Sequence, residues 1–279
     1  MIFIVLTILF TVLLFVIFRQ FTIQKIDTFQ AITINYLIAA ILSFLFSDLS
    51  IAKNPSLDFT LLKYAMLLGV YFIIMFNVMA KTTQKLGVSI SSLASKMSLV
   101  IPVVVGVIFQ NEYLSNLEVV AIVIALLYIY LTISSKNKTI GPIYLAVILF
   151  FGAGILDASL SAIEFEYLKT KQSKSLFMII IFLFAFITGS MVMIVKRKKW
   201  IFKNIKAGII LGIPNCFSIY FLLKSLQSYD TSLVFPILNI SVVLCSALVG
   251  WKIYNEDLSK TKILGLILAC ISILILIYS

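Results

Sequence analysis

The sequence lacks several residue types on which soluble enzymes and secreted modules depend. It contains no histidine, three cysteines and five prolines, and charged residues make up 12% of the chain. Without histidine, imidazole metal sites and histidine-based catalysis are excluded. The charged share is about half the usual value for a soluble domain, so there are too few polar side chains to cover a water-facing surface. These shortages exclude a soluble enzyme, a disulfide-stabilised secreted module and a disordered chain.

Apolar residues take the place of the missing polar ones. They make up 62% of the 279 residues, and the mean hydropathy is +1.16. The apolar runs are long enough for helical bilayer spans and lack the two-residue alternation of barrel strands. They fall near residues 1–18, 29–47, 61–80, 87–109, 117–134, 143–163, 175–195, 206–226, 230–252 and 262–278. We therefore predict an all-α membrane protein with ten transmembrane helices and no separate soluble domain.

Two details of these runs bear on processing and redox chemistry. The first run has no basic segment before it and no small-residue cleavage site, so we interpret it as a span and not as a signal peptide. Cys216, Cys245 and Cys270 all lie within apolar runs. We expect them to be buried as small hydrophobic residues and to form no disulfide.

The basic residues indicate an orientation. The net charge is +11, and 15 Lys or Arg residues lie in one set of alternate loops against six in the other. Because these residues sit between apolar runs, they predict membrane topology and not nucleic-acid binding. The positive-inside rule places the basic loops in the cytoplasm and both termini outside. We expect a multi-pass protein of the cell membrane, inner or plasma.

The chain repeats itself at half its length. The pattern NExLS occurs at Asn111–Ser115 and again at Asn255–Ser259, 144 residues later, and Leu68–Gly69 matches Leu211–Gly212 at an offset of 143. Further matches at that offset are Lys81 with Lys224, Gln84 with Gln227 and Ser89 with Ser232. We predict two five-helix repeats, residues 1–139 and 140–279. Because five is odd, the second repeat enters the membrane in the opposite direction, as in many secondary transporters.

These repeated segments resemble a known family. The stretches SSLASKMSLVIPVVVGVIFQNEYLSNLE and TSLVFPILNISVVLCSALVGWKIYNEDLSKTKILGLILA are similar to the drug/metabolite transporter superfamily, and specifically to its ten-helix EamA-type transporters. Pro102 with Glu112, and Pro236 with Glu256, match the proline and the Glu-x-Leu-Ser turn of each family half. The resemblance implies a transporter without naming a solute. Family members usually have both termini in the cytoplasm, which differs from the orientation that the charges predict.

Polar residues inside the spans are the candidate site, because they are costly in hydrocarbon unless they face protein or water. In the sixth run Gly154, Asp157, Ser161 and Glu164 share one helix face. Asp157 is a candidate for proton or cation coupling, or for holding a substrate amine; the alternative is a structural ion pair with Lys96. Lys96 lies midway along the fourth run, where it could also hold a substrate carboxylate.

Five further residues complete the predicted substrate site. They are Asn35, Tyr36, Asn77, Asn215 and Asn239. Asn239 corresponds to Lys96 at the 143 offset, and Asn215 follows Pro214, which removes one backbone donor. We expect most of these residues to line one central cavity, since a shared wet cavity satisfies groups that would otherwise each need a partner in hydrocarbon. Glu112 and Glu256 are predicted to be structural, because an inverted repeat places them at opposite membrane faces.

The leading hypothesis is a secondary transporter for a small polar or amphipathic metabolite, working by alternating access and coupled to protons. No GxxxxGK[ST] motif occurs, so we expect no ATP hydrolysis. The alternatives are a lipid-carrier flippase of the same architecture, which predicts a lateral opening and an apolar cavity wall, and a non-transporting scaffold. We expect no enzymatic activity, no cofactor and no metal, and a monomer whose partners are a small solute and the lipid bilayer.

Overall fold

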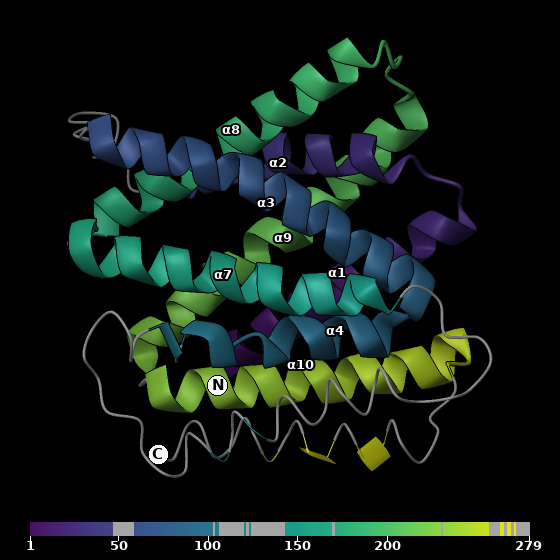
Figure 1. Ribbon diagram of the computed structural model, residues 1–279, viewed down its shortest axis with the longest axis vertical. Helices are drawn as coiled ribbons and strands as arrows, with labels where there is room; N and C mark the ends of the chain where they lie inside the picture. Colours follow the sequence, from purple (N-terminus) through teal and green to yellow (C-terminus); the bar gives the residue numbers. More distant parts are fainter. Residues whose placement is uncertain are drawn as a thin grey trace.

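The computed structural model describes residues 1–46, 59–102, 143–168, 171–229 and 231–256, together with residues 104, 105, 120, 123, 263, 264, 267, 268 and 271. These residues form helices and contain no strand. The helices, labelled as in Figure 1, are α1 (Ile2–Ile23), α2 (Thr28–Leu45), α3 (Phe59–Leu86), α4 (Val88–Met97), α7 (Tyr144–Tyr167), α8 (Lys171–Val195), α9 (Phe202–Ser228) and α10 (Thr231–Tyr254).

Seven of these helices are long and apolar enough to cross a membrane: α1, α2, α3, α7, α8, α9 and α10. They coincide with seven of the ten predicted runs. The fourth run, 87–109, forms the shorter α4 instead of one continuous span. Most of the fifth run (117–134) and of the tenth (262–278) lies outside the described residues, as do Glu112 and Cys270. The all-helical membrane class is thus observed, with eight helices among the described residues.

Short connections place the helix ends on two sides. α1 ends close to where α2 begins, α3 close to α4, and α8 close to α9. These ends and that of α10 make up what we call the basic side, because most of the basic residues that the structure describes lie there. The start of α1 and the connections from α7 to α8 and from α9 to α10 lie on the opposite side. There the N-terminal amine donates a hydrogen bond to the Tyr229 hydroxyl.

Local sequence explains how helices turn on the basic side. Lys25 and Arg197 follow α1 and α8 with φ angles of 53° and 50°. Beyond each, a backbone N–H reaches back five residues: Ile26 to the Phe21 carbonyl and Lys198 to the Met193 carbonyl. This pairing satisfies carbonyls that a helix end leaves free. Asp27 then caps the start of α2: its carboxylate accepts a hydrogen bond from the Gln30 N–H at 3.2 Å, as an N-cap does.

Helices from the two halves of the chain pack against one another in matching pairs. The contact between α2 and α9 is matched by the contact between α3 and α8. The contact between α1 and α10 is matched by the contact between α4 and α7. Gly69 of α3 and Gly212 of α9 lie at close approaches between these helices. A Cβ at Gly69 would lie 2.8 Å from the Ile181 carbonyl oxygen, and one at Gly212 would lie 2.6 Å from Ile38 Cβ. Only glycine fits such contacts, which allow helix backbones in a membrane to approach closely.

Candidate functional site

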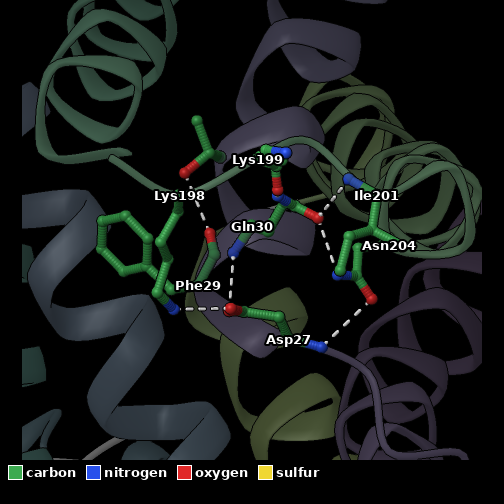
Figure 2. A network of polar contacts seen from close by, with 8 residues as sticks. Asp27, Phe29, Gln30, Lys198, Lys199, Ile201 and Asn204 are labelled. Atoms are coloured by element: carbon green, nitrogen blue, oxygen red, sulfur yellow. Dashed lines mark hydrogen bonds and ion pairs between the residues drawn. The ribbon is translucent and has the colours of Figure 1, made fainter. Parts of the chain in front are cut away.

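The basic side is held together by side chains from both halves of the chain. Figure 2 shows the contact between the start of α2 and the loop from α8 to α9. The Lys198 ammonium lies 2.6 Å from the Asp27 carboxylate. Asn204 donates to the Gln30 side-chain oxygen at 2.6 Å, which also accepts the Ile201 N–H at 3.1 Å. Burial opposes ionisation of Asp27, but hydrogen bonds from Lys198 and the Gln30 N–H outweigh it and hold the pKa of Asp27 below its usual value.

A second contact on this side joins the two repeats through Glu256. Its carboxylate accepts hydrogen bonds from the backbone N–H groups of Val88 and Ser89 at 2.6 and 3.1 Å, and from the Ser89 hydroxyl at 2.6 Å. These N–H groups open α4, where a helix presents partial positive charge. Gly87 precedes them with a φ of +98°, and a Cβ there would lie 2.5 Å from a Glu256 oxygen. Glu256 of the second NExLS turn therefore caps a helix of the first half.

The fourth predicted span is interrupted at its middle. α4 ends at Met97, and turn residues Ser98 and Leu99 separate it from the next helical residues. Proline has no N–H, so Pro102 cannot donate to the Ser98 carbonyl four residues earlier. The Ile101 N–H donates to that carbonyl instead, at 2.9 Å. The break places Lys96 in the last turn of α4, where a cation interacts favourably with the helix carbonyls.

Asp157 lies on α7, the helix that packs against α4. Its charge interacts with that of Lys96, although the two side chains do not form a contact ion pair. α7 presents a regular exposed apolar stripe at Tyr144, Ile148, Phe151 and Ile155. Asp157 is two residues beyond Ile155, about 200° around the helix, and yet it is also exposed. Asp157 is therefore exposed on the helix face opposite the apolar stripe.

The other predicted polar residues occupy several environments. Asn35 of α2 is fully buried, and neither polar atom of its side chain has a hydrogen-bond partner. Tyr36 is also fully buried; its hydroxyl donates to the Phe72 carbonyl at 3.0 Å. Asn77 is partly buried and donates to the Ile73 carbonyl of its own helix at 2.7 Å. Asn35 thus has a buried side-chain amide for which the fold provides no hydrogen-bond partner.

Asn215 and Asn239 lie in the second half of the chain. Both are buried, at 6% and 5% exposure. α9 continues through Pro214 without interruption, and the Asn215 carbonyl accepts the Ser218 hydroxyl at 2.8 Å. The clustering of all seven predicted residues around one central cavity is not established by these placements and stays a prediction.

A cavity of about 210 Å³ lies between α2, α7, α8 and α9. Its walls are mainly apolar and include four aromatic side chains, from Phe46, Phe177, Phe182 and Tyr220. Its polar lining residues are Ser43, Lys174, Ser175 and Cys216. These residues lie in the parts of their helices toward the opposite side, away from the basic side.

None of the seven predicted residues is among those lining this cavity, although three are next to its wall. Tyr36 packs against Phe182 with ring centroids 6.0 Å apart. Asn215 precedes Cys216 in the chain, and Asp157 lies one helical turn before the lining residue Leu160. The sequence analysis did not select Ser43 or Lys174, because proximity to an aromatic pocket has no signal in hydropathy.

Of the two cysteines that the structure describes, Cys216 is buried as expected and Cys245 is less so. Cys216 is buried and Cys245 is half-buried, and both are free thiols. The Cys216 sulfur lies 3.8 Å from the Ser43 hydroxyl oxygen.

Comparison with known proteins finds a family match in the first half of the chain. Residues 1–134 match the EamA-like transporter family, part of the drug/metabolite transporter superfamily, so the resemblance seen in the sequence is confirmed. The chain is also similar to an uncharacterized protein of Haemophilus influenzae, with 25% identity over 266 residues covering 89% of this chain and 88% of that protein. The family consists of transporters and not enzymes. Together with the seven apolar helices, the match makes this a multi-pass membrane protein.

Proposed function

We propose that this chain, whose first half matches the EamA-like transporter family, is a secondary transporter. It moves a small polar or amphipathic metabolite across the cell membrane by alternating access, and Asp157 couples the movement to protons. The observation that carries this proposal is the position of Asp157. A carboxylate exposed on the helix face opposite the apolar stripe would be prohibitively costly against lipid, so we place it in a water-filled path.

The break in α4 supports the same path. Transporters commonly build their sites from discontinuous helices, whose free backbone groups and terminal charges serve ions and substrates. Here the interruption after Met97 brings Lys96 to a helix end opposite α7. The charges of Lys96 and Asp157 attract each other, and movement of α4 away from α7 would weaken that attraction. Proton uptake by Asp157 would then follow the conformational change.

The packing of helix pairs supports the inverted repeat. Suppose that the helices α1 to α4 correspond, in order, to α7 to α10. Exchanging the two halves then converts the contact between α2 and α9 into a contact between α8 and α3. The same exchange turns α1–α10 into α7–α4, and both pairs of contacts occur. Gly69 and Gly212, which correspond at the 143 offset, both lie at close helix approaches in equivalent pairs. We propose ten spans in two such repeats, the fifth and tenth runs supplying the spans outside the described residues.

The two sides of the molecule differ in a way that alternating access requires. On the basic side, Asp27 with Lys198 and Glu256 with the start of α4 tie the halves together. Toward the opposite side lies the cavity between α2, α7, α8 and α9. We propose that this arrangement is the state closed to the basic side. The other state would exchange the roles of the two repeats.

The coupling role is tested with Asp157→Asn. Purified protein is first screened against metabolites for a rise in melting temperature, since ligands that bind the native state stabilise it. Uptake of a stabilising solute into proteoliposomes is then measured with and without an imposed pH gradient. The variant should still bind the solute but lose the stimulation by the gradient. Glu166→Gln, at the exposed end of α7, is the matched control and should behave as wild type.

The opposite result would reject the coupling role. If Asp157→Asn only lowers the melting temperature and uptake still responds to the pH gradient, the residue is structural. The apolar cavity wall gives the lipid-carrier flippase alternative some support, and a lipid-translocation assay on the same proteoliposomes tests it. A scaffold would carry no solute, and its interior polar residues would be replaceable without loss of function.

A further inference from the structure

We infer that the connection between α8 and α9 binds the headgroup of an anionic phospholipid, with the acyl chains lying along the adjoining ends of the two helices. We call residues 194–206 the basic segment. The structure describes every residue of this segment, and none of them lines the cavity between α2, α7, α8 and α9. The inference therefore concerns a surface outside the proposed transport path and goes beyond that function.

The basic segment carries a dense positive charge. It has six basic residues and no acidic one: Lys196, Arg197, Lys198, Lys199, Lys203 and Lys206. Lys198 is paired with Asp27. The side chains of Lys196, Arg197 and Lys199 are exposed and have no ion-pair or hydrogen-bond partner among the residues that the structure describes. Clusters of ~4–8 Lys or Arg residues beside a membrane helix attract anionic lipid headgroups.

Exposed apolar side chains flank these cations on both sides. Val195 is 82% exposed before them, and Trp200 and Phe202 are 41% and 70% exposed after them. Tryptophan is enriched at the level of the lipid headgroups, because one end of its ring system is apolar and the other can stay wet. Further exposed apolar residues follow along both helices: Ile187 and Met191 on α8, and Ile209, Ile210 and Ile213 on α9. The acyl chains of a lipid held at the cations would lie on these residues.

The backbone of the basic segment is held in place by the buried Gln30 of α2. Its side-chain amide donates to the Lys199 carbonyl at 3.0 Å, and its oxygen accepts the Ile201 N–H at 3.1 Å (Figure 2). These two bonds fix the chain on both sides of Trp200, which is exposed between them. A group of cations on a fixed backbone loses less freedom on binding a headgroup than a mobile group does.

Membrane orientation alone does not explain this arrangement, because positive charge anywhere on the basic side would set the same topology. At the end of α10, on the same side, Trp251 is also exposed. The described residues 245–256 around it contain one cation, Lys252, and one carboxylate, Glu256. An exposed tryptophan thus occurs beside six cations at Trp200 and beside one at Trp251, which makes Trp251 an internal reference.

The two tryptophans of the chain allow a direct test. Trp251→Phe leaves Trp200 as the sole tryptophan, and Trp200→Phe leaves Trp251. Each full-length protein, in micelles of a neutral detergent, is titrated with phosphatidylglycerol or phosphatidylcholine brominated on the same acyl chains, and quenching of tryptophan fluorescence is recorded. The first lipid is anionic, and the second carries the same phosphate without a net charge.

Trp200 should be quenched by phosphatidylglycerol at a mole fraction at least about tenfold lower than by phosphatidylcholine. The physical reason is that each basic residue near a charged surface contributes about fivefold to binding. Trp251 should show a much smaller difference between the two lipids.

Neutralising three cations together identifies the site. The substitutions Lys196→Gln, Arg197→Gln and Lys199→Gln should abolish the preference of Trp200 for phosphatidylglycerol. A matched control removes three charges from exposed positions elsewhere on the basic side: Lys81→Gln, Lys85→Gln and Lys252→Gln. This control should keep the preference.

Three results would overturn the inference. The first is equal quenching of Trp200 by the two lipids, and the second is equal loss of the preference in both triple variants, which would mean that only the total charge of this side matters. The third is displacement of phosphatidylglycerol by inorganic phosphate but not by chloride of the same ionic strength, which would make this a site for a soluble anion. The comparison of Trp200 with Trp251 needs no change of charge, so it decides even if a triple variant fails to fold.

Discussion

Asn35 is the polar side chain whose burial the fold explains least. Neither its amide nitrogen nor its oxygen has a partner, and a buried unsatisfied amide costs about 1–3 kcal/mol. Replacing it with leucine of similar shape should therefore leave the melting temperature unchanged or raise it. If Asn35 contacts the solute in another state, uptake should fall at least about tenfold, the size of a lost hydrogen bond between solute and protein.

Asn204 supplies the control for that experiment. Its amide is also buried, but it donates to Gln30 and accepts from the Asp27 N–H. Asn204→Leu should lower stability by about 1–3 kcal/mol, because it leaves those partners unpaired. A loss of stability in Asn35→Leu equal to that in Asn204→Leu would show that Asn35 has an unrecognised structural partner.

Asp27 gives a pH-dependent contribution to stability. Its pKa is lowered in the folded protein, so the ionised form is favoured by folding. The contribution is present above the unfolded pKa of about 3.9 and disappears as the pH falls through the lower folded value. Because Lys198 and Asp27 are 45% and 31% exposed, solvent screening limits it to about 1 kcal/mol or less.

The substitution Asp27→Asn isolates this charge, since asparagine also caps helices well. The variant should melt below wild type at pH 7, and the gap should close as the pH is lowered through about 3.9 and below. Melting temperatures of the purified protein across this range provide the measurement. A gap that stays constant down to pH 3 would mean that the charge of Asp27 is not what stabilises the contact.

At the scale of elements, the join between Glu256 and α4 is the contact most open to test. Three hydrogen bonds to one carboxylate and the positive end of a helix make its removal costly. Glu256→Ala should lower stability by about 2–3 kcal/mol, measured by thermal unfolding in detergent. Glu166→Ala, an exposed carboxylate, should have little effect. Similar melting temperatures for the two variants would contradict the role assigned to Glu256.

The apolar runs predict the spans well, because hydropathy over some twenty residues reflects the thickness of the bilayer. They do not predict the interruption after Met97, since SLVIP continues the apolar run through it. The break depends on which carbonyl Pro102 leaves without a donor, and that is a property of the three-dimensional backbone. The capping of α4 by Glu256 joins residues 167 and 168 positions apart, which local sequence cannot indicate.

At the scale of the whole molecule, orientation is the clearest open prediction. The charge bias places the loop from α8 to α9 in the cytoplasm. Lys198→Cys in intact cells, with the three native cysteines replaced, should resist a membrane-impermeant thiol reagent. Lys224→Cys, near the opposite side, should react. Efficient labelling at position 198 with protection at position 224 would establish the family's usual topology and overturn the charge-based orientation.

The candidate site was less predictable than the fold. Desolvation cost singles out Asp157, Lys96 and Asn35, because a polar group in an apolar run is conspicuous. It gives no signal for Tyr220 or Phe177, since aromatic residues are as suited to packing in the core or facing lipid as to lining a cavity. Where an apolar side chain points depends on how four helices meet, and that arrangement is visible only in the folded chain.

The contact of Glu256 with Gly87 and Ser89 also has a consequence for descent. After a duplication, two copies of a gene drift apart freely only where their products do not touch. A side chain at position 87 would strike Glu256, so neither position can change before the other without a less fit intermediate. Such linked positions are therefore expected to change more slowly than positions that make no contact across the join.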